Sequence, residues 1–349
     1  MKTSHIVTKA KRIKLGIDVH ADSYRVVRQI DDSTPQPAQK FTPDGFLSWA
    51  KKQLDQAEEV HSCYEAGPLG YSLHRALEAM GIRNIVIRPQ NWDEFKRGVK
   101  TDQTDALALV QRLDRYVQGN RHALAVVCVP TPAQELTRAQ SRQREQLLAH
   151  RLRFEAQGRS LLLFHGLRVK GRWWQAAQWQ SLCHKLSAAI IELLTVTRNL
   201  LLAVHAQTEA ATERLEAAAT PQPRGVGALT SQVLEREILD WHRFKNRRQV
   251  ASLTGLCPGV RSSGNKLHTG PITKHGNPRL RKALIELAWR CVRFQPEYPP
   301  LQKWRMVLAS PKTTGGAKQK AIVAIGRRLA IDLWRLNTGR TTAAQLGLQ

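Results

Sequence analysis

The segment that most restricts the fold runs from residue 173 to residue 219 and contains neither proline nor glycine. These two residues are the commonest interrupters of helices. Upstream, Thr131, Pro132 and Gln134 form a typical helix start, with a threonine cap, a proline at the first helical position and a glutamine at the third. We therefore predict an antiparallel, coiled-coil-like arm of long helices over residues 131–219. Such an arm either pairs two chains or forms an intramolecular bundle.

The part of the chain before the arm alternates between strand-like and helix-like patterns. Runs rich in valine and isoleucine and bounded by turn residues are typical of strands, and apolar residues at helical spacing are typical of amphipathic helices. This order predicts an α/β domain with a mixed sheet covered by helices. The predicted strands span residues 13–19, 23–31, 38–42, 59–66 and 84–89, and the predicted helices span 43–57, 70–81 and 101–118.

Four acidic residues of this part form the first candidate site. Asp18 lies in an apolar strand, Glu65 ends a later strand, and Asp102 and Asp105 lie three apart on one face of a helix start. Each has a structural explanation alone, because acids suit the first turn of a helix and polar residues often end strands. Together they predict a Mg²⁺ site, since carboxylate oxygens are the ligands that Mg²⁺ prefers and clustered like charges otherwise repel.

The second candidate site lies in residues 246–290, which are dense in glycine, proline and cations. The pattern predicts a long loop between two helices, and it favours phosphate binding by cations and backbone N–H groups. Ser262 and Ser263 stand directly before Gly264, although serine and glycine are also ordinary turn residues. His268 and His275 are candidate general bases, or solvated loop histidines.

A glycine pair before a further predicted helix resembles a degenerate helix-hairpin-helix turn, which offers N–H groups to a phosphate. The pattern of residues 315–340 predicts a packed helix whose cationic side chains approach phosphate. The predicted phosphate contacts are Gly225, Gly227, Arg261, Lys266, Lys274, Arg279 and Arg281.

The charge of the chain indicates a polyanionic partner. Lysine plus arginine number 54 and aspartate plus glutamate 28, which gives a net charge of +26 that is spread along the sequence. Nucleic acid is the simplest partner for such a charge. The five cysteines are scattered without zinc-type spacing, which favours a reducing cytoplasm. We expect no membrane span and no signal-type apolar core in the first residues.

Three blocks of the sequence resemble the DEDD-type insertion-sequence transposases, the family that includes the Piv-like invertases. These blocks are LGIDVHADSYRVV, CYEAGPLGY and KTDQTDALAL, and the resemblance extends over about residues 13–337. It implies a RuvC/ribonuclease-H-like domain in which Asp18, Glu65, Asp102 and Asp105 hold two Mg²⁺ ions. In that family a serine directly before a glycine attacks DNA phosphate, and here this position is Ser263. Ser262 is adjacent and stays an alternative.

The resemblance also implies the biological role. Members of the family excise and insert their own element, and they use a structured guide RNA from the element's non-coding end that pairs with donor and target DNA. We expect homodimers that assemble to a tetramer on DNA, because four strands must be cut in one complex. The expected localisation is the cytoplasm, at the nucleoid.

The predicted organisation has three parts: a RuvC-like metal-binding domain over residues 1–130, the arm over 131–219, and a mostly helical domain with the serine loop over 220–349. The residues alone are also compatible with two other functions. One is a metal-dependent resolvase or nuclease that hydrolyses DNA with the acids alone. The other is a non-catalytic nucleic-acid-binding protein in which the acids have a structural role.

Overall fold

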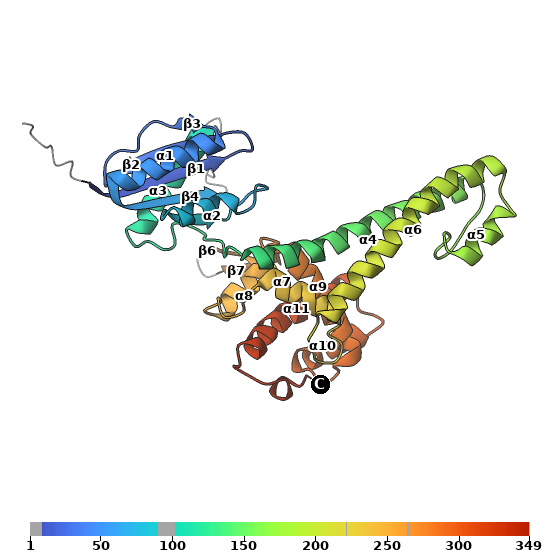
Figure 1. Ribbon diagram of the computed structural model, residues 1–349. Helices are drawn as coiled ribbons and strands as arrows, with labels where there is room; N and C mark the ends of the chain where they lie inside the picture. The colour runs from blue at the N-terminus through green and yellow to red at the C-terminus, as the bar shows by residue number, and fades with distance from the viewer. Residues whose placement is uncertain (1–8, 90–101, 221, 264–265, 349) are drawn as a thin grey trace, which may run out of the picture. The chain divides into compact units, whose positions relative to one another are not determined.

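The computed structural model describes residues 9–89, 102–220, 222–263 and 266–348. The chain divides into two compact units, residues 1–129 and 130–349, which are described separately (Figure 1). The first unit is a mixed α/β structure and the second is mostly helical. The predicted further division of the second unit at residue 219 stays a prediction.

The first unit is built on a five-stranded mixed sheet with strand order β3-β2-β1-β4-β5. β1 lies at its centre, antiparallel to β2 and parallel to β4, and β5 continues the parallel side. This confirms the predicted mixed sheet, with a hairpin group on one side and crossover connections on the other. The strands are β1 (Ala10–Val19), β2 (Tyr24–Ile30), β3 (Gln39–Phe41), β4 (Ala57–Glu65) and β5 (Arg83–Ile87).

Helices cover both faces of this sheet (Figure 1). Alternate residues of β1, among them Ile13 and Leu15, pack with Phe46 of α1 (Pro43–Gln56) and Leu77 of α2 (Ser72–Ala79). The opposite face packs on α3 (Asp102–Val117), where Cys63 of β4 lies among Leu109 and Leu113. Because successive strand residues face opposite sides of a sheet, every second residue of β1 and β4 points toward α3.

A buried lysine ties α3 to the sheet. Lys14 of β1 is 2% exposed, and its ammonium group pairs with Asp114 of α3 and donates to the Asp31 carbonyl oxygen at 2.7 Å. A buried charge is tolerated only when such partners compensate its lost hydration. This contact therefore sets the position of the C-terminal half of α3 on β1.

The second unit contains the predicted pair of long helices, which lie side by side in Figure 1. Thr131 and Gln134 form the expected capping box at the start of α4. Near the far end, Gly158 packs against the Trp173 ring so closely that a Cβ atom there would lie 2.5 Å from Cε2. The helices of this arm are α4 (Pro132–Phe164), the short α5 (Ala176–Cys183) and α6 (Ala188–Ala217).

The expectation that the chain has no membrane span stays a prediction, because one helix meets the simplest criteria for a span. α6 is long and apolar enough to cross a membrane by the criteria of length and composition. One such helix is weak evidence for a span. Leu194 and Leu201 of α6 pack with Trp173 and Trp174 in the core of the arm. The side chains of Leu193, Val196 and Leu200 are 61%, 63% and 49% exposed, so α6 also carries an uncovered apolar stripe.

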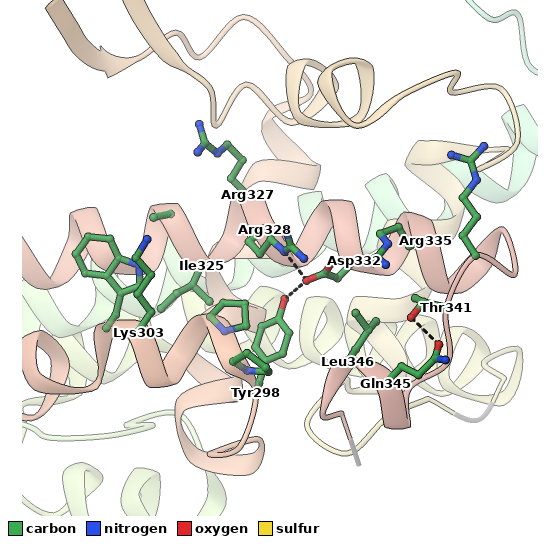
Figure 2. A pocket seen from close by; sticks show the side chains of 15 residues that line it. Tyr298, Lys303, Ile325, Arg327, Arg328, Asp332, Arg335, Thr341, Gln345 and Leu346 are labelled. Atoms are coloured by element: carbon green, nitrogen blue, oxygen red, sulfur yellow. Dashed lines mark hydrogen bonds and ion pairs between the residues drawn. The ribbon is translucent and has the colours of Figure 1, made fainter.

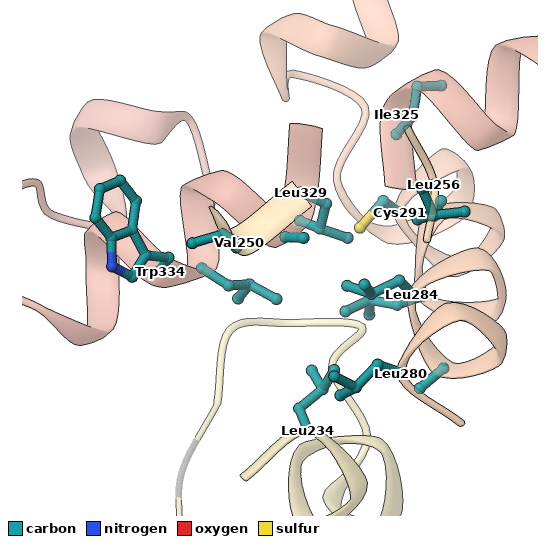
Figure 3. Packing of buried hydrophobic residues seen from close by; sticks show 14 of the residues in the cluster. Leu234, Val250, Leu256, Leu280, Leu284, Cys291, Ile325, Leu329 and Trp334 are labelled. Atoms are coloured by element: carbon teal, nitrogen blue, oxygen red, sulfur yellow. The ribbon is translucent and has the colours of Figure 1, made fainter. Parts of the chain in front are cut away.

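The rest of the second unit is a helical cluster with its own core (Figure 3). Leu280, Leu284 and Cys291 of α9 face Ile325 and Leu329 of α11 across this core. A two-stranded sheet, β6 and β7, interrupts the helices. The elements are α7 (Ala228–Ile238), α8 (Arg247–Thr254), β6 (Pro258–Ser263), β7 (Lys266–Ile272), α9 (Pro278–Phe294), α10 (Pro299–Ala309), α11 (Gly315–Asn337) and the short η1 (Ala344–Leu346).

Candidate functional site

Asp18 and Glu65 lie next to each other at one edge of the first unit's sheet. β1 and β4 are parallel, their last registered pair is Ile17 with Tyr64, and the two acids are the next residues of each strand. Neighbouring residues of parallel strands share a face, so both acids lie on the side of Gly16 and Cys63, which α3 covers. We call this region the acidic sheet edge.

Gly16 determines how closely α3 approaches the acidic sheet edge. A Cβ atom at residue 16 would lie 2.5 Å from the backbone nitrogen of Val110, and it would also overlap the Ala106 carbonyl. The backbone of α3 therefore rests directly on β1. Since Lys14 meets Asp114 and Gly16 meets Ala106, α3 runs antiparallel to β1, and its first turns extend toward Asp18.

Asp105 and Asp102 occupy those first turns. Asp105 is partly buried and lies one residue before the contact with Gly16, while the side chain of Asp102 falls outside the described residues. Asp18 is 23% exposed and its Oδ2 lies 3.1 Å from Nε2 of His20. Among the side chains that the structure describes, no three candidate ligands form a group that could hold a metal ion. The four-acid metal site stays a prediction.

Residues 258–272 form a β-hairpin where the sequence predicted a loop. β6 and β7 pair antiparallel, and Ser263 lies opposite Lys266, with two residues connecting them. Residues 264 and 265 lie outside the described part of the chain. Ser262 lies opposite Leu267 and precedes Ser263 in the register. Alternating β-branched and polar residues were too few here to reveal the strands. We call this element the serine hairpin; the side chains of residues 261–267 fall outside the described part.

Backbone hydrogen bonds close the base of the serine hairpin and tie the segment after it to the end of α8. Thr273 N donates to Cys257 O at 2.8 Å, and Asn277 N donates to Leu253 O at 2.7 Å. Arg281 Nη1 adds contacts to the Thr254 and Lys274 carbonyl oxygens at 3.4 and 3.3 Å. These contacts connect α8, the hairpin and α9 into one rigid support.

A buried carboxylate links this support to the arm. Glu237 of α7 accepts two hydrogen bonds from Arg142 of α4, each 2.8 Å long, and one from Asn277, which caps α9. Burial alone would raise the pKa of Glu237, but the hydrogen bonds from Arg142 and Asn277 outweigh it and lower that pKa. Glu237 could not be selected from the sequence, because one acid in an amphipathic helix forms no distinctive pattern.

Several predicted phosphate contacts have protein partners. Arg279 Nε lies 2.6 Å from Glu145 Oε2 on α4, and Arg281 braces the hairpin base as described. Gly225 has φ +90°, and a Cβ there would lie 2.9 Å from the Phe294 Cβ, so packing alone favours glycine at this position. A Cβ at Gly227 would lie 2.6 Å from Nη1 of Arg290, which puts a guanidinium beside the start of α7.

The remaining residues of this set are less constrained. Lys274 adopts a left-handed conformation with φ +58°, and the candidate bases His268 and His275 are exposed. Arg261 and Lys266 belong to the serine hairpin, at register positions opposite His268 and Ser263. Their phosphate contacts stay predictions.

An α/β unit with a carboxylate edge, joined to a strongly basic helical unit, suits a protein that acts on nucleic acid. The comparisons with known proteins define the class. Residues 222–301, which include α7, α8, the serine hairpin and α9, match the family model for the transposase IS116/IS110/IS902 family.

Relatives extend this match over most of the chain. A protein of Sinorhizobium fredii, named as a predicted transposase, is 32% identical over 304 residues, which are 79% of this chain and 76% of the relative. The transposase for insertion sequence element IS1533 of Leptospira borgpetersenii is 24% identical over 80% of this chain and 85% of its own. The transposase for IS1111A of Coxiella burnetii is 26% identical over 77% of this chain and 75% of its own. The chain belongs to the IS116/IS110/IS902 family of transposases, and its substrate is DNA.

Proposed function

We propose that this transposase moves its own insertion sequence by cleaving and rejoining DNA through a phosphoserine linkage at Ser263, with Mg²⁺ held by Asp18, Glu65, Asp102 and Asp105. The observation that supports it most is the position of Asp18 and Glu65, side by side on the face of the sheet that α3 covers. The first unit is then a RuvC-like domain. Its parallel pair β1 and β4 carries the first two acids at the strand ends.

The residues of the acidic sheet edge fit Mg²⁺ by their chemistry. Carboxylate oxygens are the ligands that this ion prefers, and bound Mg²⁺ stabilises negative charge on the oxygens of a reacting phosphate. Two adjacent carboxylates also repel each other unless a cation or protons compensate them. The close contact at Gly16 supports the assignment, because it brings the turn with Asp105 onto the strand that carries Asp18.

Ser263 has the role of nucleophile. Its Oγ forms a bond to phosphorus as the bond from phosphorus to one DNA oxygen breaks, the hydroxyl proton passes to a base, and the departing oxygen gains a proton. One phosphodiester thus replaces another, and a DNA hydroxyl can reverse the exchange without an external energy source. The candidate bases are His268, in β7, and His275, which follows β7, and both are exposed.

A structured guide RNA completes the proposal. Base pairing would select donor and target DNA, while the protein would bind backbone and shape, as in other RNA-guided systems. A net charge of +26 supports simultaneous binding of RNA and DNA. The complex would act at the nucleoid as a tetramer of two homodimers.

Recombination in vitro tests the metal site. The full chain is mixed with DNA that carries the element's ends, a transcript of the non-coding end and Mg²⁺. Asp18→Asn, Glu65→Gln, Asp102→Asn and Asp105→Asn should each abolish recombination and leave nucleic-acid affinity at the wild-type level. Asp55→Asn, an exposed change on α1, is the matched control and should be active.

The outcomes separate the alternatives. Near-wild-type recombination in two or more of the acid variants would contradict the shared metal site. Loss of activity only when the transcript is omitted supports the guide RNA, and equal activity without it argues against a guide. Cleaved but never rejoined DNA would favour a hydrolytic nuclease, and binding without any cleavage would favour a non-catalytic protein.

A further inference from the structure

A cavity in the second unit carries an excess of positive charge that the proposed chemistry does not use. It has a volume of about 820 Å³ and lies between α10, α11 and the C-terminal segment (Figure 2). Its lining includes five cationic side chains and one carboxylate, a net charge of +4 with tyrosine neutral. The cations are Lys303, Arg327, Arg328, Arg335 and Arg340, and the carboxylate is Asp332.

Asp332 organises two of these arginines. It is 1% exposed, and its Oδ2 accepts hydrogen bonds from Tyr298 Oη and Arg328 Nε, both at 2.8 Å. Arg335 Nη1 lies 3.5 Å from the other oxygen (Figure 2). Three donors therefore compensate a carboxylate that would otherwise be costly to bury. Asp332 therefore holds the guanidinium groups of Arg328 and Arg335 in place.

The arginines remain available to a ligand. The side chains of Arg328 and Arg335 are 47% and 37% exposed, and a guanidinium has five N–H donors in a planar fork that matches phosphate. Arg340 is held differently, with its guanidinium carbon 4.2 Å from the centre of the Trp334 ring. Pre-positioned arginines lose less side-chain entropy on binding than free ones.

The cationic lining continues toward the serine hairpin. A second cavity of about 390 Å³ shares Arg327 and Arg328 with the first and adds Arg247 and Arg248 of α8. Its lining includes Cys257, the residue directly before β6. Along α11, Arg328 and Arg335 are two turns apart, about 10 Å of helix axis. Such a row suits a chain of phosphates better than a single small anion.

We propose that these two cavities form one binding track for the phosphodiester backbone of a nucleic-acid strand, with Arg328 and Arg335 preset by Asp332. This inference rests on the proposed function, because the bound strand would pass the base of the hairpin that carries Ser263. The track binds backbone phosphate, which DNA and RNA share.

The test measures the affinity of the full chain for labelled duplex DNA, single-stranded DNA and the non-coding-end RNA over a range of salt concentrations. Arg328→Gln with Arg335→Gln should weaken binding and reduce the slope of log affinity against log salt by about 2, one per lost phosphate contact. Arg153→Gln with Arg168→Gln, two exposed arm residues, is the charge-matched control and should keep more of the slope. The nucleic acid whose binding falls most identifies the strand.

Asp332→Asn distinguishes a preset site from a merely positive surface. This change removes a negative charge, so a simple electrostatic surface would bind more tightly, whereas a preset site should bind more weakly. Thermal unfolding checks that the variant folds, and the exposed Arg328 and Arg335 variants decide the matter if it does not. Tighter binding by Asp332→Asn, or arginine variants that match the control pair, would overturn the track. A covalent serine adduct measured beside these assays reports separately on the proposed function.

Discussion

Gly16 is the residue on which the geometry of the acidic sheet edge depends most directly. Gly16→Ala would put a methyl group 2.5 Å from Val110 N, against the α3 backbone, so α3 must shift. Overpacking of this kind costs about 1–3 kcal/mol. We expect lower thermal stability of the first unit and loss of recombination. Gly67→Ala is the stability control, because its Cβ would lie 3.9 Å from the Glu65 carbonyl oxygen, an ordinary van der Waals distance. Equal stability of the two variants would contradict the close contact.

Two histidines, the buried His61 and the partly buried His74, make the first unit sensitive to acid. Burial lowers the pKa of His61 and of His74 below the ordinary value of 6.5, although a hydrogen bond to Glu59 partly opposes this at His61. As the pH falls below 6.5, the unfolded chain takes up protons that the folded state excludes, so the free energy of unfolding decreases. The stabilisation that the two neutral histidines contribute is fully present above pH 6.5. It is lost as the pH falls toward their pKa values in the folded state.

Hydrogen exchange of the β4 amides measures this effect, because it reports on the first unit without interference from the second. Protection should decrease between about pH 7 and pH 5.5 after correction for intrinsic exchange rates. A variant with His61→Gln and His74→Gln should lose most of that dependence. An unchanged pH profile in the double variant would show that other groups are responsible.

Helices and strands were best predicted from the sequence where one apolar periodicity continues through the whole element. The strands and helices of residues 10–117 were predictable because apolar residues alternate or recur at helical spacing, and the capping box at Thr131 identified the start of α4. The serine hairpin was predicted as a loop, because its glycines and prolines mask a strand pattern. The segment that follows it is tied to the end of α8 by the bond from Asn277 N to Leu253 O, a tertiary contact that no local pattern encodes.

The same reasoning explains what could be predicted of the candidate sites. The four acids could be selected because carboxylates are unusual in apolar strands and repeat at a helix start, but their mutual positions follow from β1–β4 pairing and from Gly16. The cationic cavity could not be predicted from the sequence. Arg328, Asp332 and Arg335 have the spacing of ordinary helix ion pairs, and Tyr298 joins them only through tertiary packing.

At the scale of the whole molecule, we expect the arm to join two chains. Leu193, Val196 and Leu200 are exposed on α6 at helical spacing, and a contiguous apolar stripe of this kind is typical of an interaction surface. Changing all three residues to Gln should produce monomers in sedimentation experiments, with unaltered thermal stability of the single chain and loss of recombination. Glu192→Gln with Asn199→Gln, two exposed polar changes on the same helix, should leave the dimer intact. A dimer that persists in the triple variant would exclude this stripe as the interface.

The proposed phosphoserine linkage is tested most directly by identifying the protein atom to which cleaved DNA is attached. Labelled DNA is reacted with the full chain, the guide transcript and Mg²⁺, and the products are examined for a protease-sensitive mobility shift and by mass spectrometry of the attached peptide. We expect an adduct on Ser263 that is absent in Ser263→Ala and present in Ser262→Ala. Cleaved DNA without an adduct, an adduct that persists in Ser263→Ala, or attachment to Ser262 or a tyrosine would contradict it.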